Sequence, residues 1–427
     1  MKHYKSTLIA FFALIVFGTP WFVSMYPTPT KFIDNMFSYV GKAYVNYGAI
    51  FFQEGITVTQ LQDKYKNISK SSSNKKEKIR ILIVPGHEPD FGGTEFGKLK
   101  EREMVVELAD ALKTFFANNS NYEVIVTRDN NNWNKEFDEY FKNNWDSISA
   151  FIKDSKGEMV KQMNSGAVKK LSDGVSHNNA PTNVAVRLFG INKWNNENNI
   201  DIAIHIHFND YPRANTKVAG KYTGFSIYVP EKQYSNSTTT KVIATNVFKR
   251  LSKYNAVSNL PKEEVGVIED QELIAIGSAN TLNAPSMLIE YGYIYEPQFA
   301  DELVRSANIR DLAFQTYLGV QDFFGSGNDY SLAYDTLMLP YSWNNEFGVN
   351  GGDKNEILAL QSALMTDGVY PPSNKSKNDC PRTGRFGPCT TTALNNFQIK
   401  HGITNEKDTV GKETKKTLNS IYSVQIK

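Results

Sequence analysis

The strongest constraint on the fold comes from three apolar segments that each end in chemically active side chains. Apolar runs of this length are typical of buried strands. Polar residues at the ends of neighbouring strands can point into one shared cleft. The segments and the residues near their ends are Ile79–Val84 with His87, Asp201–Asn209 with His205 and His207, and Ser286–Gly292 with Glu290. Because these places hold three of the six histidines, the pattern predicts a metal site with a carboxylate beside it.

Strand-like and helix-like segments alternate along the middle of the chain, which predicts an α/β fold. We expect a mostly parallel twisted sheet flanked by helices, a small three-helix C-terminal domain and an N-terminal membrane helix. The expected strands are 79–84, 122–127, 201–207, 224–230 and 286–290. The expected helices of the main domain are 101–116, 184–195, 238–254 and 296–324.

A length of 427 residues suggests about three domains. The divisions that we expect are an N-terminal anchor or signal at 1–28, a connector and linker at 29–78, a main domain at 79–325, a linker at 326–354 and a C-terminal domain at 355–425. The main domain contains a polar insert at about 130–181, rich in Asn and Lys. Two interpretations of the insert stay open: a lid or regulatory element, and a surface insertion without a function.

The N-terminus favours export of the rest of the chain. Two lysines in the first five residues precede the apolar run Leu8–Phe17, and this charge placement fits a cytoplasmic N-terminus. The stretch Thr7–Met25 is just long enough to span a bilayer. A cleaved signal peptide is the alternative, but aromatic residues crowd the region where a small-residue cleavage site would lie. Outside the cytoplasm, Cys380 and Cys389 would form a disulfide.

The charge balance argues against one class of partner. The chain has 47 Lys and Arg against 45 Asp and Glu, a formal net charge of +2. A nucleic-acid binder that relies on bulk charge would carry a larger positive excess. We therefore expect no nucleic-acid partner.

The residues at the strand ends predict the chemistry of the site. His87 lies in a Pro-Gly turn, and Glu101 lies in the first turn of a helix about a dozen residues later. In a strand, His205 and His207 share one face, and His207 is the nearer to the strand end. Two His and one Glu with an open fourth position form a known catalytic zinc set. Glu290 could take a proton from a water there and pass it to a leaving amine.

Spacing alone leaves simpler interpretations open. A histidine at the end of a strand is often structural. Glu101 and Glu103 could favour the helix dipole, and Glu290 could be a solvated strand end.

Six motifs occur in the order seen in one family of enzymes. They are Pro85-Gly86-His87, Leu99-Lys100-Glu101, Val126–Asp129, Arg187 with Asn192, Ile204–Asn209 and Pro285–Gly292. From Ile79 to about Phe324 the chain resembles the zinc N-acetylmuramoyl-L-alanine amidases of the amidase-3 type, which are cell-wall hydrolases. The resemblance implies Zn²⁺ as cofactor, with His87, Glu101 and His207 as its ligands and Glu290 as the catalytic residue. It also implies cleavage of the amide between the lactyl group of N-acetylmuramic acid and L-alanine of the stem peptide.

The chain departs from the family pattern at several positions near the site. Val84 stands where the family usually has Asp, and Glu88-Pro89 replace a Gly-Gly pair. His205 replaces a small residue, usually Ser, and can support a ligand, fill space or act as an alternative ligand. Glu95 and Glu103 are rivals for the role of Glu101, although the Leu-Lys-Glu motif favours Glu101.

The C-terminal domain shows the spacing of three short helices with Gly-rich turns. Its Leu-Gln, Phe-Gly, Thr-Ala-Leu, Phe-Gln and Val-Gly motifs occur in the order found in the peptidoglycan-binding domain type 1, which it resembles. The loop between Cys380 and Cys389 is an addition to that pattern. A disulfide closing about ten residues would contribute roughly 2–3 kcal/mol in the chain-entropy model.

Together these features predict an exported enzyme, anchored to the membrane by its N-terminal helix or secreted if the signal is cleaved. The expected partners are peptidoglycan, the membrane and a protein activator. Two other functions stay open at this point: a non-catalytic wall-binding or scaffold protein, and a zinc peptidase that cuts within the stem peptide.

Overall fold

The computed structural model describes residues 55–70, 77–171, 180–277, 281–326, 334–349 and 351–424. The expected N-terminal anchor or signal at 1–28 and His177 of the insert lie outside these ranges. Within them, no helix has both the length and the apolar character needed to cross a membrane.

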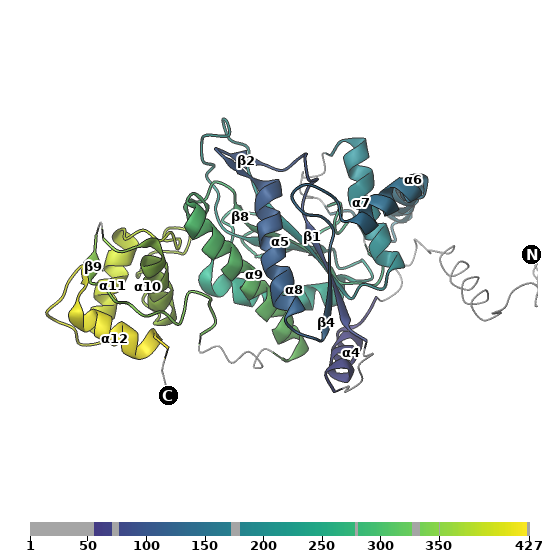
Figure 1. Cartoon of the computed structure of the whole chain (residues 1–427). Coiled ribbons are helices and arrows are strands. Elements are labelled where there is room, and N and C mark those ends of the chain that lie inside the picture. Colours follow the sequence, from purple (N-terminus) through teal and green to yellow (C-terminus); the bar gives the residue numbers. More distant parts are fainter. Residues whose placement is uncertain are drawn as a thin grey trace, which may run out of the picture. The chain divides into compact units, whose positions relative to one another are not determined.

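A six-stranded sheet forms the centre of the main domain, in the order β4-β1-β5-β8-β6-β7 (Figure 1). In this order the strands are Tyr122–Val126, Ile79–Pro85, Ile202–Asn209, Ser286–Tyr293, Ser226–Pro230 and Val267–Asp270. The first four are parallel, whereas β6 pairs antiparallel with β8 and β7 runs parallel to β6. The prediction of a mostly parallel sheet is confirmed. Strand β7 was not predicted, because two of its four residues are acidic.

Helices cover both faces of this sheet. The helices of the main domain and the segment before it are α4 (Val58–Lys70), α5 (Glu101–Ala117), α6 (Lys135–Asn164), α7 (Thr182–Glu197), α8 (Ser237–Tyr254) and α9 (Glu302–Phe324). A short antiparallel pair, β2 (Glu95–Phe96) and β3 (Leu99–Lys100), precedes α5. Helix α9 begins six residues later than predicted, because Pro297–Phe299 forms a separate 3-10 turn and Asp301 caps α9 by accepting from the Val304 amide.

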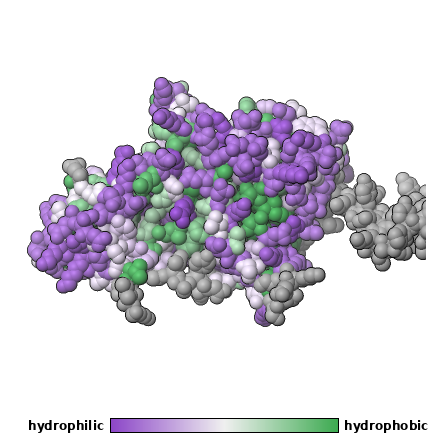
Figure 2. Space-filling view, viewed as in Figure 1, coloured by the Kyte–Doolittle hydropathy of each residue, from purple (hydrophilic) through white to green (hydrophobic). Residues whose placement is uncertain are grey.

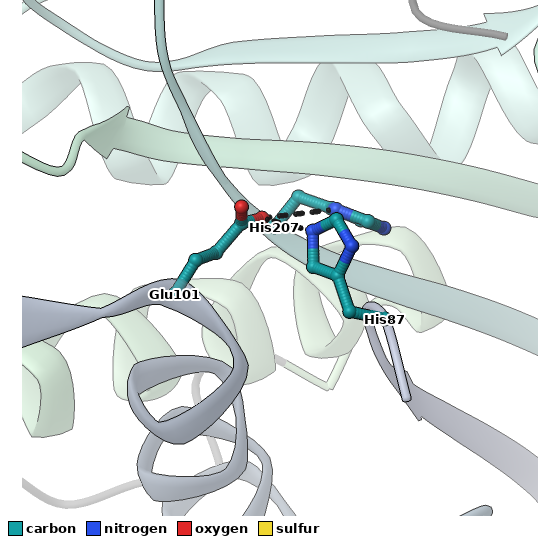
Figure 3. Close-up of side chains that lie close together, drawn as sticks. All are labelled: His87, Glu101 and His207. Carbon is teal, nitrogen blue, oxygen red and sulfur yellow. Dashed lines mark hydrogen bonds and ion pairs between the residues drawn. The ribbon is translucent and has the colours of Figure 1, made fainter. Parts of the chain in front are cut away.

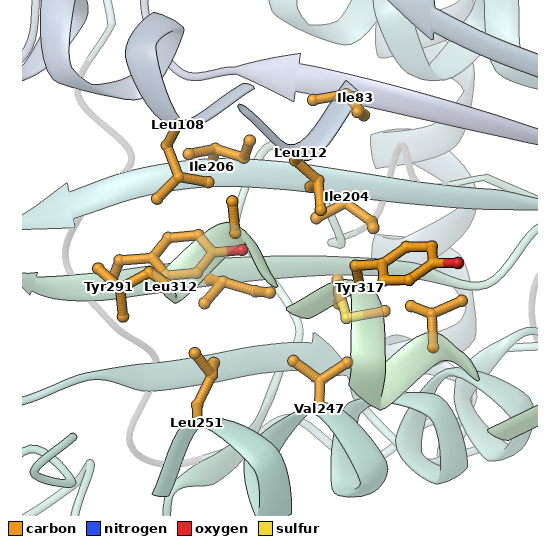
Figure 4. Close-up of a cluster of buried hydrophobic side chains, with 14 of the residues drawn as sticks. Ile83, Leu108, Leu112, Ile204, Ile206, Val247, Leu251, Tyr291, Leu312 and Tyr317 are labelled. Carbon is orange, nitrogen blue, oxygen red and sulfur yellow. The ribbon is translucent and has the colours of Figure 1, made fainter. Parts of the chain in front are cut away.

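Alternating strand residues build two apolar layers. One layer packs the sheet against α5, α8 and α9, with α4 at its margin (Figures 1 and 4). It contains Ile83, Ile204, Leu108, Val247 and Tyr317, among others. The other layer packs the opposite face against α6 and α7 and contains Leu82, Val84, Ala203, Phe141 and Trp194, among others. Most of the surface seen in Figure 2 is hydrophilic, with hydrophobic residues gathered in a few patches.

The C-terminal domain has its own apolar core. Its helices are α10 (Lys354–Thr366), α11 (Pro388–Lys400) and α12 (Lys412–Tyr422), with the two-stranded pair β9 (Phe347–Gly348) and β10 (Thr409–Val410). Leu360, Leu394 and Phe397 are fully buried there. Cys380 and Cys389 form the expected disulfide.

Candidate metal centre

Three side chains from separate elements meet at one edge of the sheet (Figure 3). His87 follows β1, Glu101 opens α5, and His207 lies near the end of β5. Because β1 and β5 are parallel neighbours, their carboxyl ends lie at the same edge. One potential ligand atom from each residue lies within 4.8 Å of the others. The structure therefore brings together the three predicted ligands, whose role in binding a metal stays a prediction.

Glu101 lies at the centre of this cluster. Its Oε1 is 2.8 Å from His87 Nε2 and 3.1 Å from His207 Nδ1. The backbone amides of Thr94 and Phe208 donate to the two carboxylate oxygens at 2.9 and 3.1 Å. Burial alone would raise the pKa of Glu101, but the charges and hydrogen bonds of the two histidines outweigh burial and lower this pKa below its usual value. The carboxylate is thus held in its ionised form.

This donor set fits a zinc ion. Two imidazoles and a carboxylate are a known catalytic zinc set that leaves one position for water or substrate. The ligand atoms must be deprotonated, and the two backbone amides that donate to Glu101 favour its ionised form. The rings of His87 and His207 stand at 76°, with their centroids 4.9 Å apart, and both line a cavity.

Close packing fixes the turn that carries His87. A Cβ at Gly86 would lie 2.3 Å from Cε1 of the His207 ring, so this position requires glycine. His87 itself has a φ of 66°, a left-handed conformation that is uncommon outside glycine. Arg128 is buried and donates to the carbonyls of His87 and Arg102, both at 3.0 Å. Burial lowers the pKa of Arg128 to about 10, so its guanidinium stays charged at neutral pH.

Glu290 lies on β8, beside the three clustered residues. It pairs in register with His207 of the neighbouring strand β5 and lines the same cavity. Only 8% of its surface is exposed, and its Oε2 has no hydrogen-bond partner within the described part of the chain. Burial, together with the negative charges of Glu101 and Glu263, raises the pKa of Glu290 well above its usual value.

A second buried carboxylate, Glu263, supports this region and was not predicted. Its Oε1 accepts from Asn209 at 2.9 Å and from the Tyr228 hydroxyl at 2.6 Å. Its Oε2 accepts from the Ser258 and Tyr293 hydroxyls. These partners come from four separate segments, so local sequence patterns contain no signal that joins them.

The cavity in front of these residues has a volume of about 740 Å³. This volume suits a ligand of moderate size. One wall is apolar and includes Val184, Leu188 and Ile191 of α7. Polar residues line another part of the cavity, where Arg213 donates from Nε to Asp210 at 2.9 Å. A substrate with both apolar and hydrogen-bonding groups would match these walls.

The remaining candidates from the sequence lie outside the cluster. His205 is buried on the cavity floor, but it is not among the three residues whose ligand atoms converge. Its Nε2 has no hydrogen-bond partner in the described ranges, and burial followed by the charge of His207 lowers its pKa to about 3. Glu103 pairs with Lys100, and Glu95 pairs with Arg102; the side chains of the two acids are 52% and 44% exposed. These contacts give Glu103 and Glu95 other partners than the two histidines.

Several solved structures of amidases are similar to part of this chain. The CwlD amidase of Clostridioides difficile, in complex with the GerS lipoprotein, is 15% identical, with a TM-score of 0.37, covering 58% of this chain and 99% of that one. Ami1 of Mycobacterium smegmatis is 12% identical, with a TM-score of 0.38, covering 58% and 100%. The catalytic domain of CwlV from Bacillus (Paenibacillus) polymyxa var. colistinus is 14% identical, with a TM-score of 0.35, covering 58% and 99%.

A family model matches the main domain of the chain. None of the curated proteins compared with the chain matches it. The family model Amidase_3, described as N-acetylmuramoyl-L-alanine amidase, matches residues 81–322. This match spans more than half of the 427 residues and contains the clustered side chains and Glu290. The chain therefore belongs to the N-acetylmuramoyl-L-alanine amidase family Amidase_3.

Proposed function

We propose that this protein is a zinc-dependent hydrolase of peptidoglycan that acts in cell-wall remodelling or cell separation. The bond that it cleaves joins the lactyl group of N-acetylmuramic acid to L-alanine of the stem peptide. One observation carries the proposal: His87, Glu101 and His207 converge on a cavity that also holds the buried carboxyl group of Glu290.

In this proposal His87, Glu101 and His207 hold the metal. Zinc bound there would polarise the scissile carbonyl and lower the pKa of a water molecule. Glu290 accepts a proton from the attacking water and delivers it to the leaving L-alanine nitrogen. Its raised pKa favours this second transfer, because a general acid must hold its proton near the working pH.

The cavity walls position the substrate. The apolar wall formed by α7 excludes water from one side of the reacting amide. The carboxylate of Asp210, whose side chain is 31% exposed, can accept hydrogen bonds from the glycan or the peptide. Glu101 is already ionised and held by two backbone amides. Fixed groups of this kind need little reorganisation during the reaction.

We further propose that the C-terminal domain is a peptidoglycan-binding domain type 1 and that the enzyme works outside the cytoplasm. An N-terminal membrane helix, or a cleaved signal, would deliver it there, and a protein activator would regulate it. Tethering a weak wall-binding domain to the catalyst raises the local concentration of the catalyst at the polymer. Membrane fractionation and protease treatment of intact cells test this location, and a C-terminal domain protected by the intact membrane would contradict it.

A digestion of purified peptidoglycan tests the reaction. The full chain is expected to release new L-alanine amino termini, and both a metal chelator and Glu290→Ala should abolish them. Other new amino termini would instead indicate a peptidase acting within the stem. Binding without any cleavage would indicate a scaffold protein, and unchanged product after Glu290→Ala would refute the assigned mechanism.

A further inference from the structure

The turn that carries His87 needs support from outside itself. His87 has a φ of 66°, and such a conformation persists only where the surroundings hold it. The next residue, Glu88, is 5% exposed although it is an acid in a turn. Its carboxylate therefore points into the protein, where it meets a partner from a distant segment.

That partner is Arg187 of α7, 99 residues further along the chain. Arg187 Nε donates to Glu88 Oε1 at 2.6 Å, and Nη2 donates to Oε2 at 2.6 Å. Two parallel bonds between a guanidinium and a carboxylate fix orientation as well as distance. The Glu88 side chain is 6% exposed and that of Arg187 is 22% exposed, so solvent screens the pair weakly.

Arg187 is itself held in place by its own helix α7 and by α6, the helix of the insert. Val186 and Ile191 on the same helix are buried against the sheet. The guanidinium carbon of Arg187 lies 6.0 Å from the centroid of the Trp145 ring on α6. The pair α6 and α7 thus presents a fixed guanidinium to the turn beside His87.

We propose that Arg187 is a positioning residue for the metal centre, acting through Glu88 on the backbone that orients His87. This inference rests on the proposed function in one respect, that His87 binds the metal. It assigns a role to the insert: its helix α6 packs against α7 and so supports the turn that carries His87. In that case α6 has a structural role next to the metal centre, and the insert is not a surface insertion without a function.

Two roles of the ion pair between Arg187 and Glu88 can be told apart by metal affinity: a purely structural role and a positioning role. If the pair merely docks α7 on the sheet, its loss lowers stability and leaves metal affinity unchanged. If it orients His87, its loss loosens residues 86–93 and weakens metal binding. Partners that orient a metal ligand from behind typically change metal affinity by about 10–100-fold when removed.

The experiment compares variants of the full chain by two measurements. Arg187→Met removes the guanidinium and keeps an aliphatic side chain. Arg187→Lys keeps the positive charge but cannot form two parallel hydrogen bonds. Glu88→Gln keeps the shape of the acid and removes its charge. Lys193→Met is the matched control, because Lys193 pairs with Glu197 on the same helix and contacts Tyr140. Hydrogen exchange of the amides in 86–93 is measured on metal-free protein, and zinc affinity is measured by competition with a chromogenic chelator.

We expect Arg187→Met and Glu88→Gln to speed exchange in 86–93 and to weaken zinc binding by about 10–100-fold. Arg187→Lys should fall between these variants and the wild type, and Lys193→Met should match the wild type in both measurements. Unchanged zinc affinity in Arg187→Met and Glu88→Gln would overturn the inference. If the wild type binds no zinc, the proposed function fails. Faster exchange in the variants would still support the conclusion that the Arg187–Glu88 pair holds the turn. Arg187→Lys keeps the test available if Arg187→Met does not fold.

Discussion

The two histidines of the candidate metal centre are held in different ways. His207 lies within β5, where Ile206 pairs with β1 and His207 itself pairs with β8. His87 lies in a turn with a left-handed φ, where Arg128 donates to its carbonyl and Arg187 pairs with the adjacent Glu88. Strand pairing positions a side chain by backbone bonds alone, whereas a turn depends on particular side chains elsewhere. Mutations should therefore separate chemistry from positioning.

Replacing Glu290 should have the largest effect on activity, because Glu290 carries the proposed proton transfer. Strand pairing, and not a side-chain partner, holds it in place. Glu290→Gln should lower kcat by about 10²–10⁴-fold, the usual contribution of a general acid–base group. Because strand pairing fixes the residue, zinc affinity should stay close to that of the wild type. Kinetics on a soluble muramyl peptide and a zinc titration measure the two effects. A parallel loss of zinc would show that Glu290 also helps to hold the metal.

Gly86 lies where the turn of His87 meets the His207 ring, so Gly86→Ala should disturb both histidines at once. The new Cβ would fall 2.3 Å from the His207 ring, and either the turn or the ring must move. We expect a loss of about 1–3 kcal/mol in the free energy of unfolding, as for other overpacked sites, and weaker zinc binding. The matched control is Gly157→Ala in α6, where a Cβ meets open space. Wild-type zinc affinity in Gly86→Ala would contradict the close fit that we describe.

His205 tests whether position on the strand is enough to make a ligand. It lies on the same strand as His207 and lines the cavity, but its ligand atoms do not reach the cluster. His205→Ser should keep zinc affinity within a few-fold and lower stability by about 1–3 kcal/mol, because a cavity replaces the buried ring. His207→Ala should abolish tight zinc binding. Chelator competition and chemical denaturation of both variants decide the matter.

The part of the site that lies on strands, His207 and Glu290, could be predicted from sequence more fully than the turn that carries His87. Apolar runs ending in His207 and Glu290 indicate strands, and the parallel sheet then brings their ends together. The motif order selected Glu101 over Glu103 and Glu95, and the structure places Glu101 between the two histidines. These inferences use local patterns and one rule about parallel sheets.

The supports of the turn could not be predicted, because each depends on a contact between distant segments. Arg128 and Arg187 belong to motifs that the sequence shows, yet nothing local indicates that they meet the backbone of His87 and the side chain of Glu88. Glu263 likewise gains its partners only when several segments of the main domain have packed together.

The smallest expected effect concerns the stability of the metal-free protein as a function of pH. Burial raises the pKa of Glu290, so the folded state keeps a proton that the unfolded chain releases above about pH 4.3. Stability from this residue is therefore complete below that pH and falls as the pH rises towards the folded pKa. Glu290→Gln lacks this titration, whereas Glu101, whose lowered pKa acts in the opposite direction, is present in both proteins. The free energy of unfolding of the wild type relative to Glu290→Gln should thus decrease as the pH rises above about 4.3. Urea denaturation with a chelator present measures it, and a difference that stays constant with pH would mean that the strand holds Glu290 in a better solvated position than its burial indicates.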